Sequence, residues 1–300
     1  MKKLTILTLI FFSCFGVFGQ AKTGISGAVE WDTLRINAVV SLNLAQAGVK
    51  LPSGRTQGES LLNSSYLSFI QPCLLGLQVD SNSTMGDLVA RGELNLTQIE
   101  AIARGANLTS PALSQDMKNI TTSVLISIPN ISASLLRHNR PSPVLRTLNP
   151  ISTARYTGII IIALDELPVF GFRKTAMPVP CLFPKIWDSE MNLIYERFML
   201  EPQSQAQGAA QGASMVRYFA AKNIFQNNPS GLSDELREIV GDRPLRIFAR
   251  GVFGMKPTDL IIERSDALVI ISSEENRRLL SQGKVVFILD ESVLRYEFGE

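Results

Sequence analysis

Residues 56–76 read TQGESLLNSSYLSFIQPCLLG, and we predict that the rest of the first half of the chain is organised around a helix in this stretch. Its apolar side chains recur at the steps of one helix face. They are Leu62, Tyr66, Phe69, Ile70, Cys73 and, one residue beyond the stretch, Leu77. Thr56 and Glu59 have the spacing of a capping box, which predicts where the helix begins. Pro72 removes a backbone donor, so we expect a kink or an end near Ser68, with Gly76 as the other candidate stop.

Strand and turn signals on both sides of this helix predict a small α+β domain over residues 21–136. Residues 31–44 and 119–128 alternate apolar and polar side chains, as strands with one buried face do. Between them, Thr84 and Asp87 are placed to cap a short helix. The order strand, helix, strand, strand predicts an antiparallel sheet with a helix on one face.

Two segments between the helix and the second strand carry a family resemblance. They are GLQVDSNSTMGDLVARGEL at residues 76–94 and IEAIARGA at residues 99–106. With the long helix before them, residues 53–136 resemble the FlgP-like family of bacterial envelope lipoproteins, whose domain is also similar to the N-terminal domain of the flagellar protein FlgT. Members form rings or disks around the flagellar motor or sit at the outer membrane. The resemblance implies a non-enzymatic, oligomeric structural or assembly protein at the flagellar basal body or the outer membrane.

In the second half of the chain, the sequence predicts another small domain over residues 151–300, after a proline-rich linker at 137–150. The apolar run at 156–164 is typical of a strand covered on both faces. The fold class that we predict is therefore α+β, with two small domains, each an antiparallel or mixed sheet with a helix packed on one face. Further elements are expected as strands at 245–253 and 284–290, short strands or a strand and turn at 260–262 and 267–271, a hairpin around 188–192, helices at 215–225 and 273–280, and a low-complexity connector at 203–213.

Residues 1–20 have the pattern of a secretory signal peptide, with two lysines before an apolar core. Cleavage after Gly19 is one expected outcome. Lipoprotein processing at Cys14 is the other, and it would leave a membrane tether. In either case we expect an exported protein of the periplasm or the outer membrane.

Charge and cysteine usage limit the classes of partner. The formal charge is +2, and loss of the two leader lysines lowers Lys plus Arg from 29 to 27, equal to the 27 Asp plus Glu. A neutral chain argues against nucleic acid as a partner. Of the remaining cysteines, we expect Cys73 and Cys181 to be separate buried thiols, with a disulfide between them as the alternative.

No catalytic signature is present, so we expect no catalytic, cofactor-binding or metal-binding residues and no cofactor. His138, the only histidine, falls in the linker and is expected to be exposed. Three acid pairs follow predicted strands, where acids ordinarily serve turns and solvent; they are Asp165/Glu166, Asp188/Glu190 and Asp290/Glu291. Arg104 and Arg250 each precede a glycine, and we expect solvated strand edges there or, alternatively, interface residues.

Two functions therefore stay open, besides a secreted enzyme, which would need a cluster of acids with perturbed pKa values in one cleft. One is the structural or assembly protein, with self-association and other envelope or flagellar proteins as partners. The other is a periplasmic binding module for a peptide, glycan or protein, with no relation to the flagellum. Open strand edges in the first domain suit strand addition. A concave apolar pocket with a few convergent polar groups would favour this second function.

Overall fold

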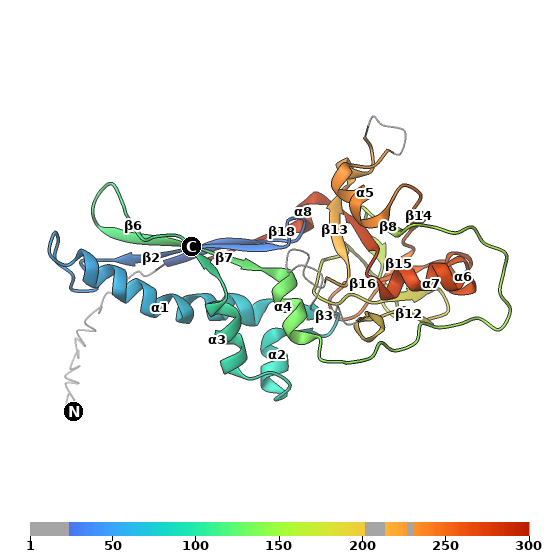
Figure 1. The fold of residues 1–300 in the computed structure, drawn as a ribbon, viewed down its shortest axis with the longest axis horizontal. Helices are drawn as coiled ribbons and strands as arrows, with labels where there is room; N and C mark the ends of the chain where they lie inside the picture. The colour runs from blue at the N-terminus through green and yellow to red at the C-terminus, as the bar shows by residue number, and fades with distance from the viewer. Residues whose placement is uncertain (1–23, 202–213, 227–230, 300) are drawn as a thin grey trace, which may run out of the picture.

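The computed structural model describes residues 24–201, 214–226 and 231–299. They form two α+β domains, the first around an antiparallel sheet and the second around a parallel one (Figure 1). The predicted fold class is therefore confirmed. The predicted signal peptide with Cys14 and the connector at 203–213 lie outside the described residues.

The first domain is an antiparallel sheet in the order β18-β1-β2-β7-β5, with β6 also paired to β7. Its strands are β1 (Gly24–Glu30), β2 (Arg35–Asn43), β5 (Asn107–Leu108), β6 (Ala112–Leu113), β7 (Asn119–Ser127) and β18 (Arg295–Phe298). Burial alternates along β2 and β7, because successive side chains point to opposite faces. The strands predicted at 31–44 and 119–128 are confirmed. β1 was not predicted, and its two glycines weaken the strand signal.

Helix α1 (Arg55–Gly76) packs on β2 and β7 through a stripe of buried residues. It continues through Pro72 and stops at Gly76, so the predicted stop at Gly76 is confirmed and an end at Ser68 is wrong. Ser68 is exposed, so water can hydrate the carbonyl oxygen that Pro72 leaves without its helical donor. The predicted capping box is also wrong, because no side chain caps the helix and Glu59 instead forms an ion pair with the first helical residue.

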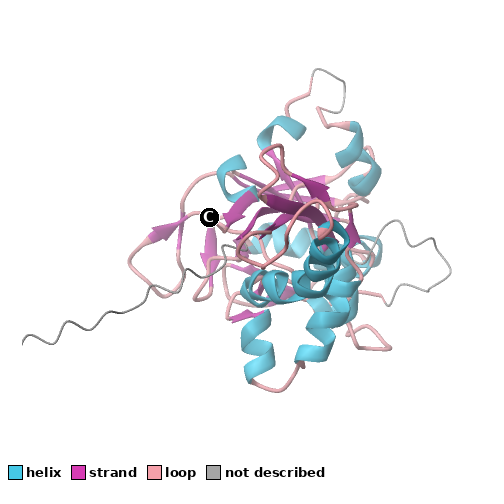
Figure 2. Ribbon diagram, turned by 90° about the vertical axis from the view of Figure 1, so that its left-hand side faces the viewer, coloured by secondary structure: helices cyan, strands magenta, loops and turns pink. Residues whose placement is uncertain are grey.

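Shorter helices follow on the same side of the sheet as α1, and Figure 2 shows helices below the strands in its view. They are α2 (Met85–Ala90), α3 (Leu96–Arg104) and α4 (Ile128–Leu135), with the small hairpin β3 (Gln78–Asp80) and β4 (Ser83–Thr84) before them. The capping box at α2 is confirmed. The Asp87 backbone N–H donates to Thr84 Oγ1 at 3.2 Å, and the Thr84 N–H donates to Asp87 Oδ2 at 2.7 Å.

The second domain contains a parallel sheet in the order β13-β17-β8-β14. Its strands are β8 (Ile159–Ala163), β13 (Arg217–Ala220), β14 (Leu245–Phe248) and β17 (Val285–Leu289). Every residue of β8 and β17 is buried, as the continuous apolar run predicted. Ile160, Ile162 and their neighbours face α5 (Asp234–Val240). Ile159 and Ile161 face the other way, into the core that continues into the first domain.

A second, mixed sheet of this domain has the order β12-β11-β16-β15. Its strands are β11 (Ile186–Asp188), β12 (Leu193–Tyr195), β15 (Gly251–Phe253) and β16 (Asp259–Ile262), beside the hairpin of β9 (Leu167–Pro168) and β10 (Thr175–Ala176). The predicted hairpin around 188–192 is confirmed by β11 and β12. The remaining elements are α6 (Arg264–Ser272), α7 (Glu274–Ser281), α8 (Glu291–Leu294) and the 3₁₀ turns η1 (Arg197–Met199) and η2 (Ala221–Asn223).

Three predictions of secondary structure in this domain are wrong. The single strand expected at 245–253 is two strands in different sheets, β14 and β15. Residues 215–225 form β13 and η2 rather than a helix, and residues 267–271 lie in α6 rather than in a strand or turn. Residues 215–225 and 267–271 each contain a short, largely buried apolar run, and periodicity alone does not separate a strand from a helix in such runs.

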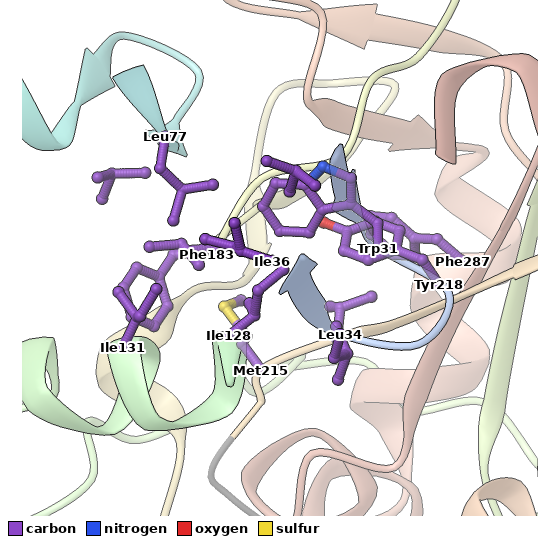
Figure 3. Close-up of a cluster of buried hydrophobic side chains, with 14 of the residues drawn as sticks. Trp31, Leu34, Ile36, Leu77, Ile128, Ile131, Phe183, Met215, Tyr218 and Phe287 are labelled. Atoms are coloured by element: carbon purple, nitrogen blue, oxygen red, sulfur yellow. The ribbon is translucent and has the colours of Figure 1, made fainter. Parts of the chain in front are cut away.

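The domains share one core. Trp31, at the end of β1, lies against Tyr218 of β13 with ring centroids 5.7 Å apart, and Tyr218 lies 6.0 Å from Phe287. Figure 3 shows these rings beside Ile36 and Ile128 of the first domain. The chain also returns to the first domain at its end, because β18 pairs with β1. The predicted second domain, residues 151–300, therefore extends too far, because the strand pairing places residues 295–298 in the sheet of the first domain.

The predicted linker is an extended and mostly exposed segment that runs around the outside of the second domain, as the green segment after α4 shows in Figure 1, and a few hydrogen bonds attach it there. His138 is half-buried and its Nε2 lies 2.8 Å from the Leu200 carbonyl oxygen, so the prediction of an exposed histidine is wrong. The Ser142 N–H donates to the Phe198 carbonyl oxygen at 2.6 Å. In the described ranges, no helix has both the length and the apolar character needed to cross a membrane.

Candidate functional site

A concave apolar site of about 740 Å³, which we call the junction groove, lies where the two domains meet. It forms because α1 packs mainly on β2 and β7 and leaves the β1–β18 margin of the same sheet face less covered. The groove is lined by Ile25, Val29, Trp31, Ser68, Phe69, Pro72, Cys73, Gly76, Leu77, Gln78, Val179, Pro180, Lys256, Ser292, Val293, Arg295, Tyr296, Phe298 and Gly299. Its walls therefore come from α1, from β1 and β18, and from the loop before β11.

Strand β18 gives the groove two aromatic side chains. Tyr296 pairs with Val29 and Phe298 pairs with Gly27, which places both rings on the sheet face that bears α1. A Cβ atom at Gly27 would lie 2.8 Å from Phe298 Cζ and 2.2 Å from the Asn37 carbonyl oxygen. Glycine therefore allows the Phe298 ring to lie over β1. Tyr296 remains 64% exposed, so its ring is available to a ligand.

The outer edge of β18 is open. β18 ends the strand order of the first sheet, and β1 is its strand partner within the part of the chain that the structure describes. An edge strand presents backbone N–H and C=O groups to which a further strand can be added. The groove thus combines an apolar wall with an open backbone edge.

The charged side chains that line the groove are basic. No aspartate or glutamate is among the described residues that line it. Arg295 is neutralised by Glu30 at 3.2 Å and Glu297 at 3.3 Å. Lys256 is exposed and forms no ion pair with any residue that the structure describes. The groove therefore presents one unneutralised positive charge at its rim and suits a ligand that is apolar with an acidic group.

Cys73 lines the groove as a protonated thiol. Burial raises its pKa to about 12, so the thiolate that a nucleophile or metal ligand requires is scarce at neutral pH. Burial also raises the pKa of Cys181 well above its usual value. Both cysteines are free, as predicted, although Cys73 is half-buried and Cys181 is fully buried.

A buried carboxylate links the two domains beside the groove. Asp259 accepts hydrogen bonds from Ser81 Oγ at 3.0 Å, the Lys185 N–H at 3.1 Å and Trp187 Nε1 at 3.3 Å. Burial raises the pKa of Asp259, and these hydrogen bonds oppose the rise. Ser81 lies in the turn between β3 and β4, so Asp259 ties this hairpin of the first domain to the second domain.

Backbone contacts complete the same junction. The Leu182 and Phe183 N–H groups donate to the carbonyl oxygens of Gln78 and Val79, at 3.0 and 2.8 Å. Gly254 has a φ of +109°, and a Cβ atom there would lie 2.3 Å from the Cβ of Ser81. The two domains therefore meet along hydrogen-bonded backbone, and the groove walls are fixed relative to one another.

The acid pairs singled out in the sequence are placed in different environments. Asp165 and Asp290 follow neighbouring parallel strands; Asp165 is exposed, and Asp290 caps α8 by accepting from the Ser292 N–H. Asp188 is fully buried, which corrects the expectation of a solvated acid. It does serve a turn, because it accepts from the Asn192 N–H at 2.8 Å, and it is ion-paired with Arg264.

The environment of Asp188 determines its charge. Burial raises the pKa of Asp188, but the bonds from Asn192 and Arg264 outweigh that effect and hold the pKa below its usual range. Asp188 is therefore a structural anion and not a proton donor at neutral pH. Among the described residues, no group of three or more His, Cys, Asp or Glu side chains is arranged to hold a metal ion.

The two arginines before glycines are solvent-exposed. Arg104 ends α3 and lies 3.9 Å from Glu100, and Arg250 lies 3.8 Å from Glu263. Arg250 follows β14 at a strand edge, as the solvated alternative predicted, whereas Arg104 is on a helix. Neither arginine lines the junction groove. The groove itself was not predicted from the sequence. The alternation of charged and aromatic residues from 295 to 298 is the signal that could have indicated its edge strand.

The fold and the groove define a class: an α+β protein of two interlocked domains with a ligand-sized groove at their junction. Two family models match the chain in this arrangement. Residues 22–134 match the N-terminal domain of Treponema pallidum Tp0624, and residues 158–291 match the second domain of the same protein. A search of curated proteins found no match. β18 lies beyond both matched ranges, and the FlgP-like resemblance stays a prediction.

Proposed function

We propose that this chain is a non-enzymatic, extracytoplasmic assembly protein that binds an extended segment of a partner protein in its junction groove. The observation that carries the proposal is the apolar groove of about 740 Å³ beside the open edge of β18. Ligand sites in proteins are typically about 300–1,000 Å³ and mainly apolar. A groove of this kind is the feature that favours a binding module.

The mode of binding follows from the geometry of β18. A partner strand could pair with its open backbone edge, while alternate side chains of that strand enter the groove beside Tyr296 and Phe298. The apolar walls favour aliphatic or aromatic side chains in the partner. Lys256 at the rim favours an acidic residue next to them.

Photocrosslinking at one groove position tests the proposal. Tyr296 is replaced by a photoreactive phenylalanine analogue in cells, and the crosslinked segment is identified by mass spectrometry. Phe248, which is equally exposed at 64% but lies outside the groove, is the matched control position. We expect an adduct at 296 and none at 248. Equal adducts at both positions, or none at 296, would contradict the proposal.

A binding measurement then separates groove binding from chance proximity. The identified segment is synthesised and titrated against the wild type and against Tyr296→Arg, which places a charge in the apolar groove. We expect affinity to fall by roughly tenfold or more, because an interface aromatic commonly contributes over 1 kcal/mol. Amide exchange in β18 should slow when the segment binds. Unchanged exchange there would rule out strand addition.

Self-association is a second candidate, in line with the structural role that the FlgP-like resemblance implies. The face of the first sheet opposite α1 has a hollow of about 750 Å³ lined by residues that include Asn37, Val39, Ser123 and Leu125. Val39 is 43% exposed at its centre. A second copy could cover this face, so Val39→Glu should lower the sedimentation coefficient of an oligomer. A wild type that sediments as a monomer at high concentration would refute this candidate.

Two further tests address location. Palmitate labelling of the protein, lost in Cys14→Ala, is expected if the alternative lipoprotein processing occurs. Tomography of flagellar motors in cells with and without the gene tests the basal-body role. Loss of a ring density would support that role, and unchanged motors with normal swimming would remove it.

A further inference from the structure

A hairpin loop on the second domain exposes two phenylalanines at its tip. Residues 169–174 connect β9 and β10, and the loop is closed by a hydrogen bond from the Val169 N–H to the Lys174 carbonyl oxygen at 3.0 Å. Gly171 has a φ of +81°, which permits the tight turn. Phe170 is 48% exposed and Phe172 is 63% exposed.

The loop is held firmly on the domain. Val169 is buried and bridges Val252, and the Phe170 N–H donates to the Val252 carbonyl oxygen at 2.9 Å. The backbone is therefore fixed in a position that presents the rings to solvent. Because exposed apolar area is unfavourable in water, a fixed apolar tip of this kind indicates a binding surface.

The exposed rings continue into a row of aromatic side chains. The ring centroids of Phe170 and Phe253 are 6.1 Å apart, and those of Phe253 and Trp187 are 5.5 Å apart. Met255, two residues after Phe253, is 83% exposed. The apolar surface thus extends from the loop tip across β15 to β11.

Positive charges surround this row. Lys174 Nζ lies 5.3 Å from the Phe172 ring, and Lys185 Nζ lies 5.8 Å from the Trp187 ring. None of the cations on this surface forms an ion pair with an acid in the described ranges; they are Arg173, Lys174, Lys185 and Lys256. At the base of the hairpin, Glu166 accepts a hydrogen bond from Thr175. We call the row and these cations the aromatic–basic surface.

We propose that the aromatic–basic surface binds the headgroup layer of an anionic lipid membrane. Phe170, Phe172 and Met255 enter the boundary between headgroups and acyl chains, and the cations contact lipid phosphates. Amphipathic surfaces with aromatic and basic residues bind membranes in this way. The proposal shares only Lys256 with the junction groove; its other side chains lie outside that groove, and it needs no protein partner.

Two observations favour a membrane over single-stranded nucleic acid, which also binds surfaces with aromatic and basic residues. Met255 is the most exposed of these apolar side chains, at 83%, and its thioether offers a base no stacking plane but suits an acyl boundary. The two phenylalanines also lie in the exposed loop of a hairpin, which suits insertion into a soft surface.

Vesicle co-sedimentation tests the proposal. The protein used starts at Gln20, which keeps every described residue and removes the leader and Cys14, since both would bind vesicles themselves. The vesicles contain phosphatidylcholine alone, or equal amounts of phosphatidylcholine and phosphatidylglycerol. We expect binding to the anionic vesicles that weakens with added salt.

Matched variants locate the binding. Phe172→Ser should lower the partition coefficient by roughly tenfold, because a largely exposed ring no longer enters the membrane. Arg173→Gln should lower it by about fivefold, the effect of one cation near an anionic surface. Phe248→Ser is the control, because Phe248 is exposed to a similar extent but is not among the residues in the ring contacts of this surface. It should bind like the wild type.

The outcomes are distinct. Binding that is lost in Phe172→Ser and kept in Phe248→Ser supports the proposal. Absence of wild-type binding, or equal binding by both variants, overturns it. A homopolymeric single-stranded DNA is titrated in parallel. Binding of that DNA without vesicle binding would overturn the membrane proposal and assign the surface to nucleic acid.

Discussion

Replacement of Trp31 by alanine tests whether the two domains are one thermodynamic unit. Trp31 is 5% exposed, and its ring lies 5.7 Å from that of Tyr218 across the junction (Figure 3). Its backbone N–H also donates to the Leu294 carbonyl oxygen at 2.9 Å. Truncation of a buried tryptophan costs about 3–5 kcal/mol through lost burial and the cavity that remains. We expect the free energy of unfolding to fall by this amount.

Urea unfolding, followed by circular dichroism and by tryptophan fluorescence, measures the effect; the fluorescence comes from Trp31 and Trp187 in the wild type and from Trp187 alone in the variant. Because the core is continuous, the wild type should unfold in one transition that both probes report at the same midpoint. Trp31→Ala should lower the midpoint and keep the slope. Phe248→Ala, at an exposed site, should change the free energy by less than about 0.5 kcal/mol.

Two results would refute this reasoning. One is a wild type with two separated transitions, which would mean that the domains unfold independently. The other is a loss below about 1 kcal/mol in Trp31→Ala, a size typical of surface changes and not of a buried tryptophan. The first result would also remove the argument that the groove walls are fixed relative to one another.

Two substitutions test the junction and the buried ion pair, and one reactivity measurement tests the groove thiol. Gly254→Ala should cost about 2 kcal/mol or more in thermal unfolding, because φ is +109° and the new Cβ would clash across the junction, whereas Gly24→Ala has open space and should be nearly neutral. Arg264→Met should cost about 3 kcal/mol at pH 7 by leaving buried Asp188 without its cation. Because the pKa of Asp188 is lowered in the folded protein, the ionised carboxylate stabilises the fold at pH values above 3.8, the pKa in the unfolded chain, and this stabilisation is lost as the pH falls below that value. The difference in the free energy of unfolding between the wild type and Arg264→Met, measured in urea, should therefore shrink at acid pH. Cys73 should react with a disulfide reagent at neutral pH roughly thirtyfold more slowly than a free thiol, because the loss of thiolate outweighs its greater nucleophilicity, and a fast reaction would contradict the pKa of about 12.

Several elements could be predicted from the sequence because local patterns decide them. The helix stripe through Leu62, Tyr66 and Ile70 and the alternation along β2 and β7 each report one buried face. The capping box of Thr84 and Asp87 is local as well, since both partners lie within one turn.

The elements that were missed depend on distant partners. β18 becomes a strand by pairing with β1, and the contact of Arg295 with Glu30 spans 265 positions in the chain. β13 has apolar residues at helical spacing, yet Tyr218 and Phe219 are both buried, because each face of the strand is covered. Tertiary burial overrides local preference in such segments. The junction groove was not foreseen for the same reason, since its walls come from segments far apart in the sequence.

Lys256 connects the two proposed binding surfaces. It lies on the rim of the junction groove, and it follows Met255 on the aromatic–basic surface. A membrane bound to the aromatic–basic surface would therefore hold the groove near the headgroups, where anionic lipid competes with an acidic partner residue for the same cation.

Single variants separate the two uses of this cation. Lys256→Gln should weaken vesicle binding and groove binding together, by about fivefold for vesicles. Arg173→Gln should weaken vesicle binding alone, because Arg173 does not line the groove. Anionic vesicles should also lower the affinity of the wild type for the groove segment, and this effect should disappear in Lys256→Gln. If vesicles leave the affinity of the wild type unchanged, the two surfaces act independently and Lys256 serves at most one of them.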